Sequence, residues 1–135
     1  KVVSKPRASG VILVCASLDS QESQAKAKAF EALGVEVIAM ANANGKVDLP
    51  KLFVYLAKER HMNEIHVEAG FKLNGSLLRE GCVDELLLYY APFFMGEGIG
   101  MANLSPLTAL DQRQDWQIID QTLFGSDLRL RLGKK

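Results

Sequence analysis

Short apolar runs alternate with helical patterns along the first half of the chain, and this alternation restricts the fold more than any other feature. Residues 10–17 form a continuous apolar run rich in β-branched side chains, and residues 35–41 predict a second strand. Residues 64–68 predict a third, short strand, in which Ile65 and Val67 alternate with polar residues. Each of these three segments is followed by a stretch with apolar residues at helical spacing. A repeated strand–helix order predicts an α/β fold with a parallel sheet and right-handed crossovers.

Capping signals give the expected helix boundaries. Asp19 and Glu22 fit a capping box at the start of the first helix, and Gly34 is a suitable stop. Asp48 is the expected cap of a second helix. A third helix is expected over residues 71–79, directly after the run at 64–68.

The second half of the chain has a different pattern. Residues 83–94 form another long apolar run, which predicts a strand, and residues 95–115 form a loop that contains glycine and proline. Residues 117–124 and 127–132 predict two strands joined by a turn at Gly125-Ser126. We therefore expect an antiparallel hairpin added to the edge of the parallel sheet.

Composition excludes several classes of function. The 135 residues make one domain or a piece of one, and their formal net charge of zero gives no field that favours nucleic acid. Cys15 and Cys82 lie in apolar stretches without zinc-ligand spacing, which favours two buried thiols in a reducing cytosol. No apolar run is long enough to predict a membrane span.

The turn at Ala69-Gly70 is the strongest candidate for a binding site. A helix that begins there points its first backbone N–H groups toward the end of the preceding strand, where they attract phosphate. Glycine lets the backbone turn and lets a ligand approach without a Cβ in the way. A phosphate or nucleotide site is one interpretation, and an ordinary structural turn is the other. The chain lacks a G-x-G-x-x-G element, which disfavours a Rossmann dinucleotide domain.

Linked motifs around this turn resemble a known family. The segment VEAGFKLNGSLL, beginning at Val67, is followed by GCVDELLLYYAPFFMGEG, beginning at Gly81. This order closely resembles the C-terminal reductase part of the bifunctional riboflavin-biosynthesis deaminase/reductase. The resemblance implies a dihydrofolate-reductase-like three-layer α/β sandwich, with a mostly parallel sheet and a C-terminal antiparallel hairpin.

The same resemblance implies an activity. It implies a cytoplasmic, homodimeric 5-amino-6-(5-phosphoribosylamino)uracil reductase, in which NADPH gives a hydride to the ribosyl carbon and the ribitylamino product forms. There are two alternatives. One is another NADPH-dependent reductase of this fold, and the other is a non-catalytic nucleotide-binding or dimerisation module. The chain is expected to be the C-terminal portion of a reductase domain. The first strands, the family's catalytic aspartate and the deaminase domain would lie before Lys1, so little turnover is expected from the chain alone.

Site residues follow from the resemblance. Glu68 is expected beside the reacting centre as the catalytic carboxylate, and Ser17, at the end of the first strand, beside the adenosine, with Lys5 and Arg7 as nearby basic candidates. The backbone that would hold the NADPH pyrophosphate comprises Gly70, Phe71, Lys72 and Leu73. Structural roles stay open for all of these residues. Glu68 and Lys72 also suit solvated charges, Ser17 suits helix capping, and Phe71 and Leu73 suit core packing.

Overall fold

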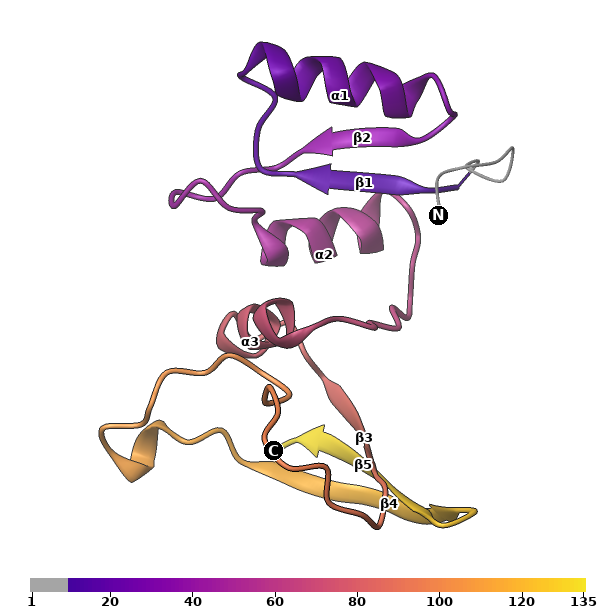
Figure 1. The fold of residues 1–135 in the computed structure, drawn as a ribbon. Helices are drawn as coiled ribbons and strands as arrows, with labels where there is room; N and C mark the ends of the chain where they lie inside the picture. Colours follow the sequence, from indigo (N-terminus) through magenta and orange to yellow (C-terminus); the bar gives the residue numbers. More distant parts are fainter. Residues whose placement is uncertain (1–9) are drawn as a thin grey trace. The chain divides into compact units, whose positions relative to one another are not determined.

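The computed structural model describes residues 10–135, which belong to two compact units, 1–63 and 64–135 (Figure 1). The extended lead-in expected for residues 1–9, together with Lys5 and Arg7, lies outside the described residues. Each unit has its own sheet, and the two are described in turn.

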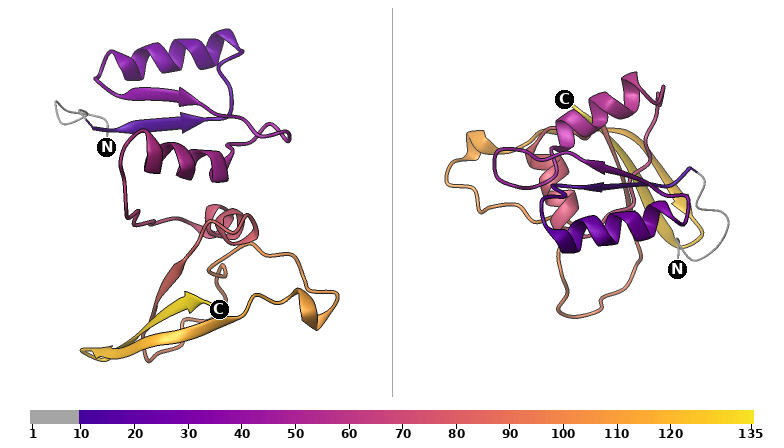
Figure 2. Two further views of the ribbon diagram at one scale, coloured as in Figure 1. Left: turned by 180° about the vertical axis from the view of Figure 1, so that it is seen from behind. Right: turned by 90° about the horizontal axis from the view of Figure 1, so that it is seen from above.

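The first unit is a parallel pair of strands between two helices. Strands β1 and β2 pair with Ile12 opposite Glu36 and Cys15 opposite Ala39. Helix α1 covers one face of the pair and α2 covers the other (Figures 1 and 2). The elements are β1 (Ile12–Cys15), α1 (Gln21–Glu31), β2 (Glu36–Ala39) and α2 (Leu49–Lys58). Its buried apolar side chains are Ala27, Val35, Met40 and Leu49.

The cap of α1 differs from the expectation. Ser20, not Asp19, is the N-cap, and its hydroxyl oxygen accepts a hydrogen bond of 3.0 Å from the Ser23 amide. This start places Glu22 at the second helical position, from which it cannot make the return bond of a capping box. Glu22 instead pairs with Lys26 one turn later, at 2.5 Å. The predicted box of Asp19 and Glu22 is therefore wrong.

Two other boundary signals in the first unit are confirmed. The chain leaves α1 through Gly34, whose φ of +82° is a conformation that glycine adopts without strain. The Asp48 carboxylate accepts a 3.0 Å bond from the Lys51 amide and so caps α2. Local capping chemistry was sufficient to predict both positions.

The second unit is built on an antiparallel sheet in the order β3-β5-β4. The predicted hairpin is confirmed, with Gly125 in its turn at a φ of +61°. Its predicted place at the edge of the parallel sheet is wrong, because the hairpin pairs with β3 in a sheet of its own. Strand β3 pairs antiparallel with β5, so β1–β2 is the only parallel pair in the described part of the chain. The elements are α3 (Phe71–Arg79), β3 (Glu85–Tyr90), a 3-10 turn (Leu110–Gln112), β4 (Trp116–Phe124) and β5 (Asp127–Lys134).

The expected strand at residues 64–68 is wrong for this structure. No strand is assigned to the segment, and the side chains of His66 and Glu68 are 70% and 90% exposed. A strand exists only with a neighbour that completes its hydrogen bonds, and residues 10–135 provide no ladder partner for this run. The parallel sheet is therefore shorter than the alternating sequence pattern suggested.

Two ion pairs connect the strands of the antiparallel sheet. Arg131 of β5 donates to both carboxylate oxygens of Glu85 on β3, at 2.8 and 2.7 Å. Arg129 of β5 donates to Asp120 of β4 at 2.6 Å. The hydrogen bond from Arg131 lowers the pKa of Glu85, and the hydrogen bond from Arg129 is the main reason that the pKa of Asp120 is also lowered.

These pKa shifts predict how stability depends on pH. A carboxylate whose pKa is lower in the folded state stabilises the fold above its unfolded pKa of about 4, and the contribution disappears as pH falls through the folded pKa. We expect the double variant Glu85→Gln, Asp120→Asn to have a lower melting temperature than the unmodified chain at pH 7. The difference should shrink as pH falls below the unfolded pKa of about 4 and disappear once both carboxyl groups are protonated in the folded state. Melting curves from pH 7 to pH 2 measure it, and a difference that stays constant over this range would contradict the prediction.

Candidate functional site

The candidate site lies where α3 begins. Gly70 is the N-cap residue, with φ −90° and ψ 175°, and no side chain caps the helix there. The first backbone hydrogen bond of the helix runs from the Asn74 amide to the Gly70 carbonyl, at 3.0 Å. The amides of Phe71, Lys72 and Leu73 precede this bond and are the N–H groups that a helix start presents to a ligand.

Space around Gly70 suits an anion. Gly70 is exposed, and a Cβ placed on it would meet no described atom within 4 Å. The space directly beside Gly70 is therefore open at this helix start, where a phosphate would bind. The use of the backbone of Gly70, Phe71, Lys72 and Leu73 for a pyrophosphate remains a prediction.

The side chains of the same turn have different surroundings. Lys72 is exposed and Leu73 is 44% exposed, so neither is packed in a core. Phe71 is half-buried, and its ring lies 3.8 Å from the position that a Cβ on Gly100 would take. Core packing is therefore wrong as the explanation of Leu73, whereas Phe71 packs against the loop.

Glu68 precedes the turn and points into solvent. The Glu68 carboxylate lies 3.7 Å from the Nε2 atom of His66, and both side chains are largely exposed. The short run at residues 64–68 predicted that Glu68 ends a strand, and no strand is assigned here. Its predicted catalytic role therefore depends on the family resemblance and remains a prediction.

Ser17 lies in the other unit, after the end of β1. Its hydroxyl oxygen accepts a hydrogen bond of 3.4 Å from the Asp19 amide. Ser17 thus shapes the connection to α1, where Ser20 is the cap. Ser17 and Gly70 belong to different units, and the role of Ser17 beside an adenosine remains a prediction.

A loop segment seated on α3 was missed by the sequence analysis. Residues 101–103 contact the helix at Gly75, where a Cβ would lie only 2.7 Å from the carbonyl carbon and the amide nitrogen of Asn103. The side chains of Asn74 and Arg79 donate hydrogen bonds to the carbonyl oxygens of Met101 and Asn103. A glycine inside a helical pattern was the signal that could have indicated this contact.

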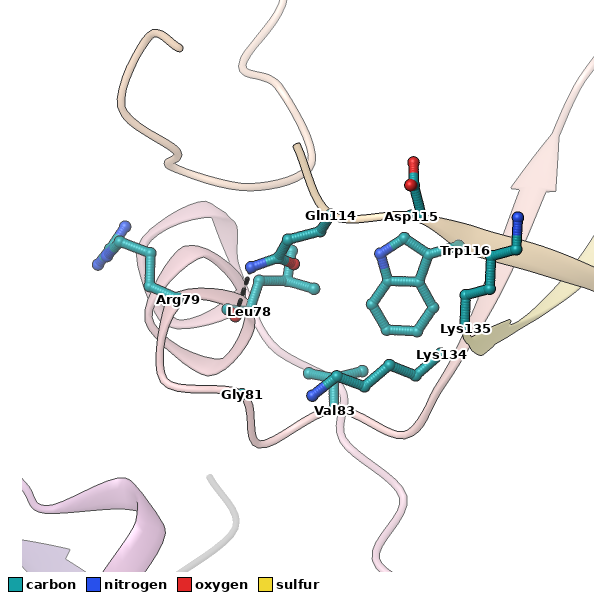
Figure 3. A pocket seen from close by; sticks show the side chains of 9 residues that line it. All are labelled: Leu78, Arg79, Gly81, Val83, Gln114, Asp115, Trp116, Lys134 and Lys135. Carbon is teal, nitrogen blue, oxygen red and sulfur yellow. Dashed lines mark hydrogen bonds between the residues drawn. The ribbon is translucent and has the colours of Figure 1, made fainter. Parts of the chain in front are cut away.

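A separate hollow of about 240 Å³ lies at the other end of α3 (Figure 3). The Trp116 indole is part of its lining, and the Gln114 side-chain amide donates a 3.0 Å hydrogen bond to the Leu78 carbonyl near the helix end. The same carbonyl accepts a 3.2 Å hydrogen bond from the Gly81 amide, so Gln114 is a second donor at the end of the helix. The lining contains none of the predicted site residues, and we assign it a packing role.

Residues 10–135 contain neither a metal-ligand cluster nor a membrane-spanning helix. Within residues 10–135, no group of three or more His, Cys, Asp or Glu side chains is arranged to hold a metal ion. None of the helices described here combines the length and the apolar character that a membrane span needs. Cys15 and Cys82 are both thiols.

Comparison with known proteins decides the family. Residues 1–128 match the family model of the RibD C-terminal domain. The chain belongs to the RibD C-terminal domain family. Among curated relatives, riboflavin biosynthesis protein RibD of Haemophilus influenzae is 38% identical over 73 residues, which are 53% of this chain and 20% of that protein. RibD of Escherichia coli K12 is 34% identical over 99 residues, which are 73% of this chain and 27% of that protein.

Solved structures agree with this family. Acinetobacter baumannii RibD, form 2, superposes with a TM-score of 0.69 at 27% identity, over 80% of this chain and 29% of that one. A pyrimidine reductase-like protein of Corynebacterium diphtheriae superposes with a TM-score of 0.67 at 19% identity, over 93% of this chain and 49% of that one. This similarity shows a shared fold. The predicted α/β, dihydrofolate-reductase-like fold class is confirmed, with the parallel part limited to two strands. The chain therefore covers about a quarter or less of the length of the two curated relatives: 20% of the Haemophilus influenzae protein and 27% of the Escherichia coli protein.

Proposed function

We propose that the chain is part of an NADPH-dependent reductase of riboflavin biosynthesis. The substrate would be 5-amino-6-(5-phosphoribosylamino)uracil, and reduction at the ribosyl carbon would give the ribitylamino product. The observation that carries the proposal is the coincidence of the family match with an open helix start at Gly70. The protein would act in the cytoplasm as a homodimer.

The residues at this helix start fit a dinucleotide phosphate. Three amides without intrahelical partners, together with the positive end of the helix dipole, stabilise a negative charge. Lys72 adds a cationic side chain on the same exposed turn. NADPH would supply the hydride, and the protein would bind and orient it.

Two further residues complete the proposed site. Glu68, two residues before Gly70, would place a carboxylate near the reacting centre, where it can accept a hydrogen bond or hold a proton. Its neighbour His66 lies 3.7 Å from the carboxylate, on the same exposed segment. The Ser17 hydroxyl would donate a hydrogen bond to the adenosine part of the cofactor.

A cofactor titration tests the proposal. We expect NADPH to bind the chain with half-saturation between about 1 μM and 1 mM, the usual range of KM values. NADH should bind more weakly, and Ser17→Ala should reduce that difference. Calorimetry measures the affinities, and amide exchange should show protection of residues 71–73 in the complex.

The controls separate the proposal from its alternatives. Inorganic pyrophosphate should compete with NADPH, because both would use the same amides. A non-catalytic dimerisation module would bind neither ligand, and this result would overturn the proposal. Protection confined to residues outside 70–73 would also overturn it.

A further inference from the structure

Residues 101–103 of the loop after β3 are hydrogen-bonded to two side chains of α3. The Asn74 side-chain amide donates to the Met101 carbonyl at 2.9 Å. Arg79 donates to the Asn103 carbonyl, and its guanidinium also donates to the Ser76 hydroxyl at 3.0 Å. Gly75 lies between these anchors, and its missing side chain lets the two backbones touch. The segment is therefore held by specific bonds to the helix.

The seated segment reaches the first turn of the helix. The Asn103 amide donates a 2.9 Å hydrogen bond to the Phe71 carbonyl. The Phe71 carbonyl and the Lys72 N–H belong to one planar peptide unit, so fixing the carbonyl also fixes the direction of the N–H. A donor at the carbonyl polarises the same unit and makes its N–H a stronger donor.

From these contacts we propose that Asn74 and Arg79 are positioning residues for the cofactor phosphate. They hold residues 101–103 on α3, and Asn103 in turn holds the Phe71–Lys72 peptide whose N–H faces the proposed anion. This inference rests on the proposed function, because it needs a phosphate at the start of the helix. Neither side chain touches the cofactor in this arrangement.

Electrostatics alone do not explain a role for these two residues. Asn74 is uncharged, so its removal leaves the charge of the site unchanged. Arg79 is at the last position of the nine-residue helix, whereas the proposed anion is at its first turn. An effect of both residues on phosphate affinity would therefore have to pass through the seated segment.

Substitution of the anchors tests the inference by NADPH affinity. We expect Asn74→Ala and Arg79→Gln each to weaken NADPH binding about fivefold to tenfold, the effect of one net hydrogen bond. Amide exchange at Asn103 should become faster in both variants. Arg79→Lys, which keeps a donor, should recover part of the affinity. Arg79 is exposed, so its variants should still fold.

A control variant separates positioning from a general loss of stability. Asp120→Ala removes an ion pair in the hairpin and contacts none of residues 70–79 or 100–103 through the hydrogen bonds described. It should lower the melting temperature and leave NADPH affinity unchanged. Equal NADPH affinity in Asn74→Ala, Arg79→Gln and the unmodified chain would overturn the inference alone. Failure of the unmodified chain to bind NADPH would overturn the proposed function with it.

Discussion

Replacing Gly75 with alanine should destabilise the second unit by about 2 kcal/mol, although alanine is the better helix former. The helix itself would gain up to about 1 kcal/mol from the substitution. The new Cβ would lie 2.7 Å from two backbone atoms of Asn103 and would displace residues 101–103 from their seat. Three hydrogen bonds to the helix would be lost with them, at about 1 kcal/mol each. The loss exceeds the gain.

Thermal unfolding followed by circular dichroism measures this effect. In a unit of the size of residues 64–135, a loss of about 2 kcal/mol corresponds to a decrease in melting temperature of roughly 8–16 °C. Gly98→Ala is the matched control, because Gly98 has no described atom within 4 Å of a Cβ and no left-handed φ. It should change stability by less than about 0.5 kcal/mol. A Gly75→Ala variant as stable as the unmodified chain would show that the loop contact contributes little.

Where the sequence predicted the fold correctly, local chemistry was sufficient. Helix α3 spans Phe71–Arg79, as expected from the leucine spacing and the glycine before it. The hairpin has its turn at Gly125-Ser126, because a two-residue turn between antiparallel strands needs a residue that accepts a left-handed φ. Asp48 caps α2 through its own side chain. Each of these features depends on residues a few positions apart.

Where the prediction failed, the missing information was a distant partner. Residues 64–68 alternate like a strand, but pairing decides whether a strand forms, and the described residues offer none. The choice between Asp19 and Ser20 as a cap depended on where the β1–α1 connection ends. The sequence does not reveal what contacts Gly75, because its partner, Asn103, lies 28 positions later in the chain.

The candidate site was predictable where it depends on local sequence and not where it depends on a distant segment. The amides of residues 71–73 are available because Gly70 begins the helix, which is a local property. The anchors Asn74 and Arg79 act through the loop, and no spacing rule connects them to it. The roles of Glu68 and Ser17 need a bound cofactor to define them, and they remain predictions.

Replacing Gly70 with aspartate should have opposite effects on folding and on cofactor binding. Aspartate is a good N-cap and its charge suits the helix dipole, so stability should stay equal or rise by a few tenths of a kcal/mol. The open space at Gly70 accommodates the side chain, and a φ of −90° suits any residue. If a cofactor phosphate rests on the next three amides, the new carboxylate lies roughly 5 Å from it. Repulsion of about 3 kcal/mol would then weaken NADPH binding about a hundredfold.

Asparagine at the same position separates charge from size. Gly70→Asn has nearly the shape of aspartate and caps the helix without a negative charge, so it should lose less affinity for NADPH than Gly70→Asp. Calorimetric titration of both variants, at low salt and at about 0.5 M salt, measures the difference, which should shrink as salt screens the repulsion. If both variants bind NADPH as the unmodified chain does, phosphate does not rest at the start of α3. A loss of affinity that is equal for Asn and Asp would instead indicate a steric effect, with the anion close to Gly70 but its charge already neutralised, for example by Lys72.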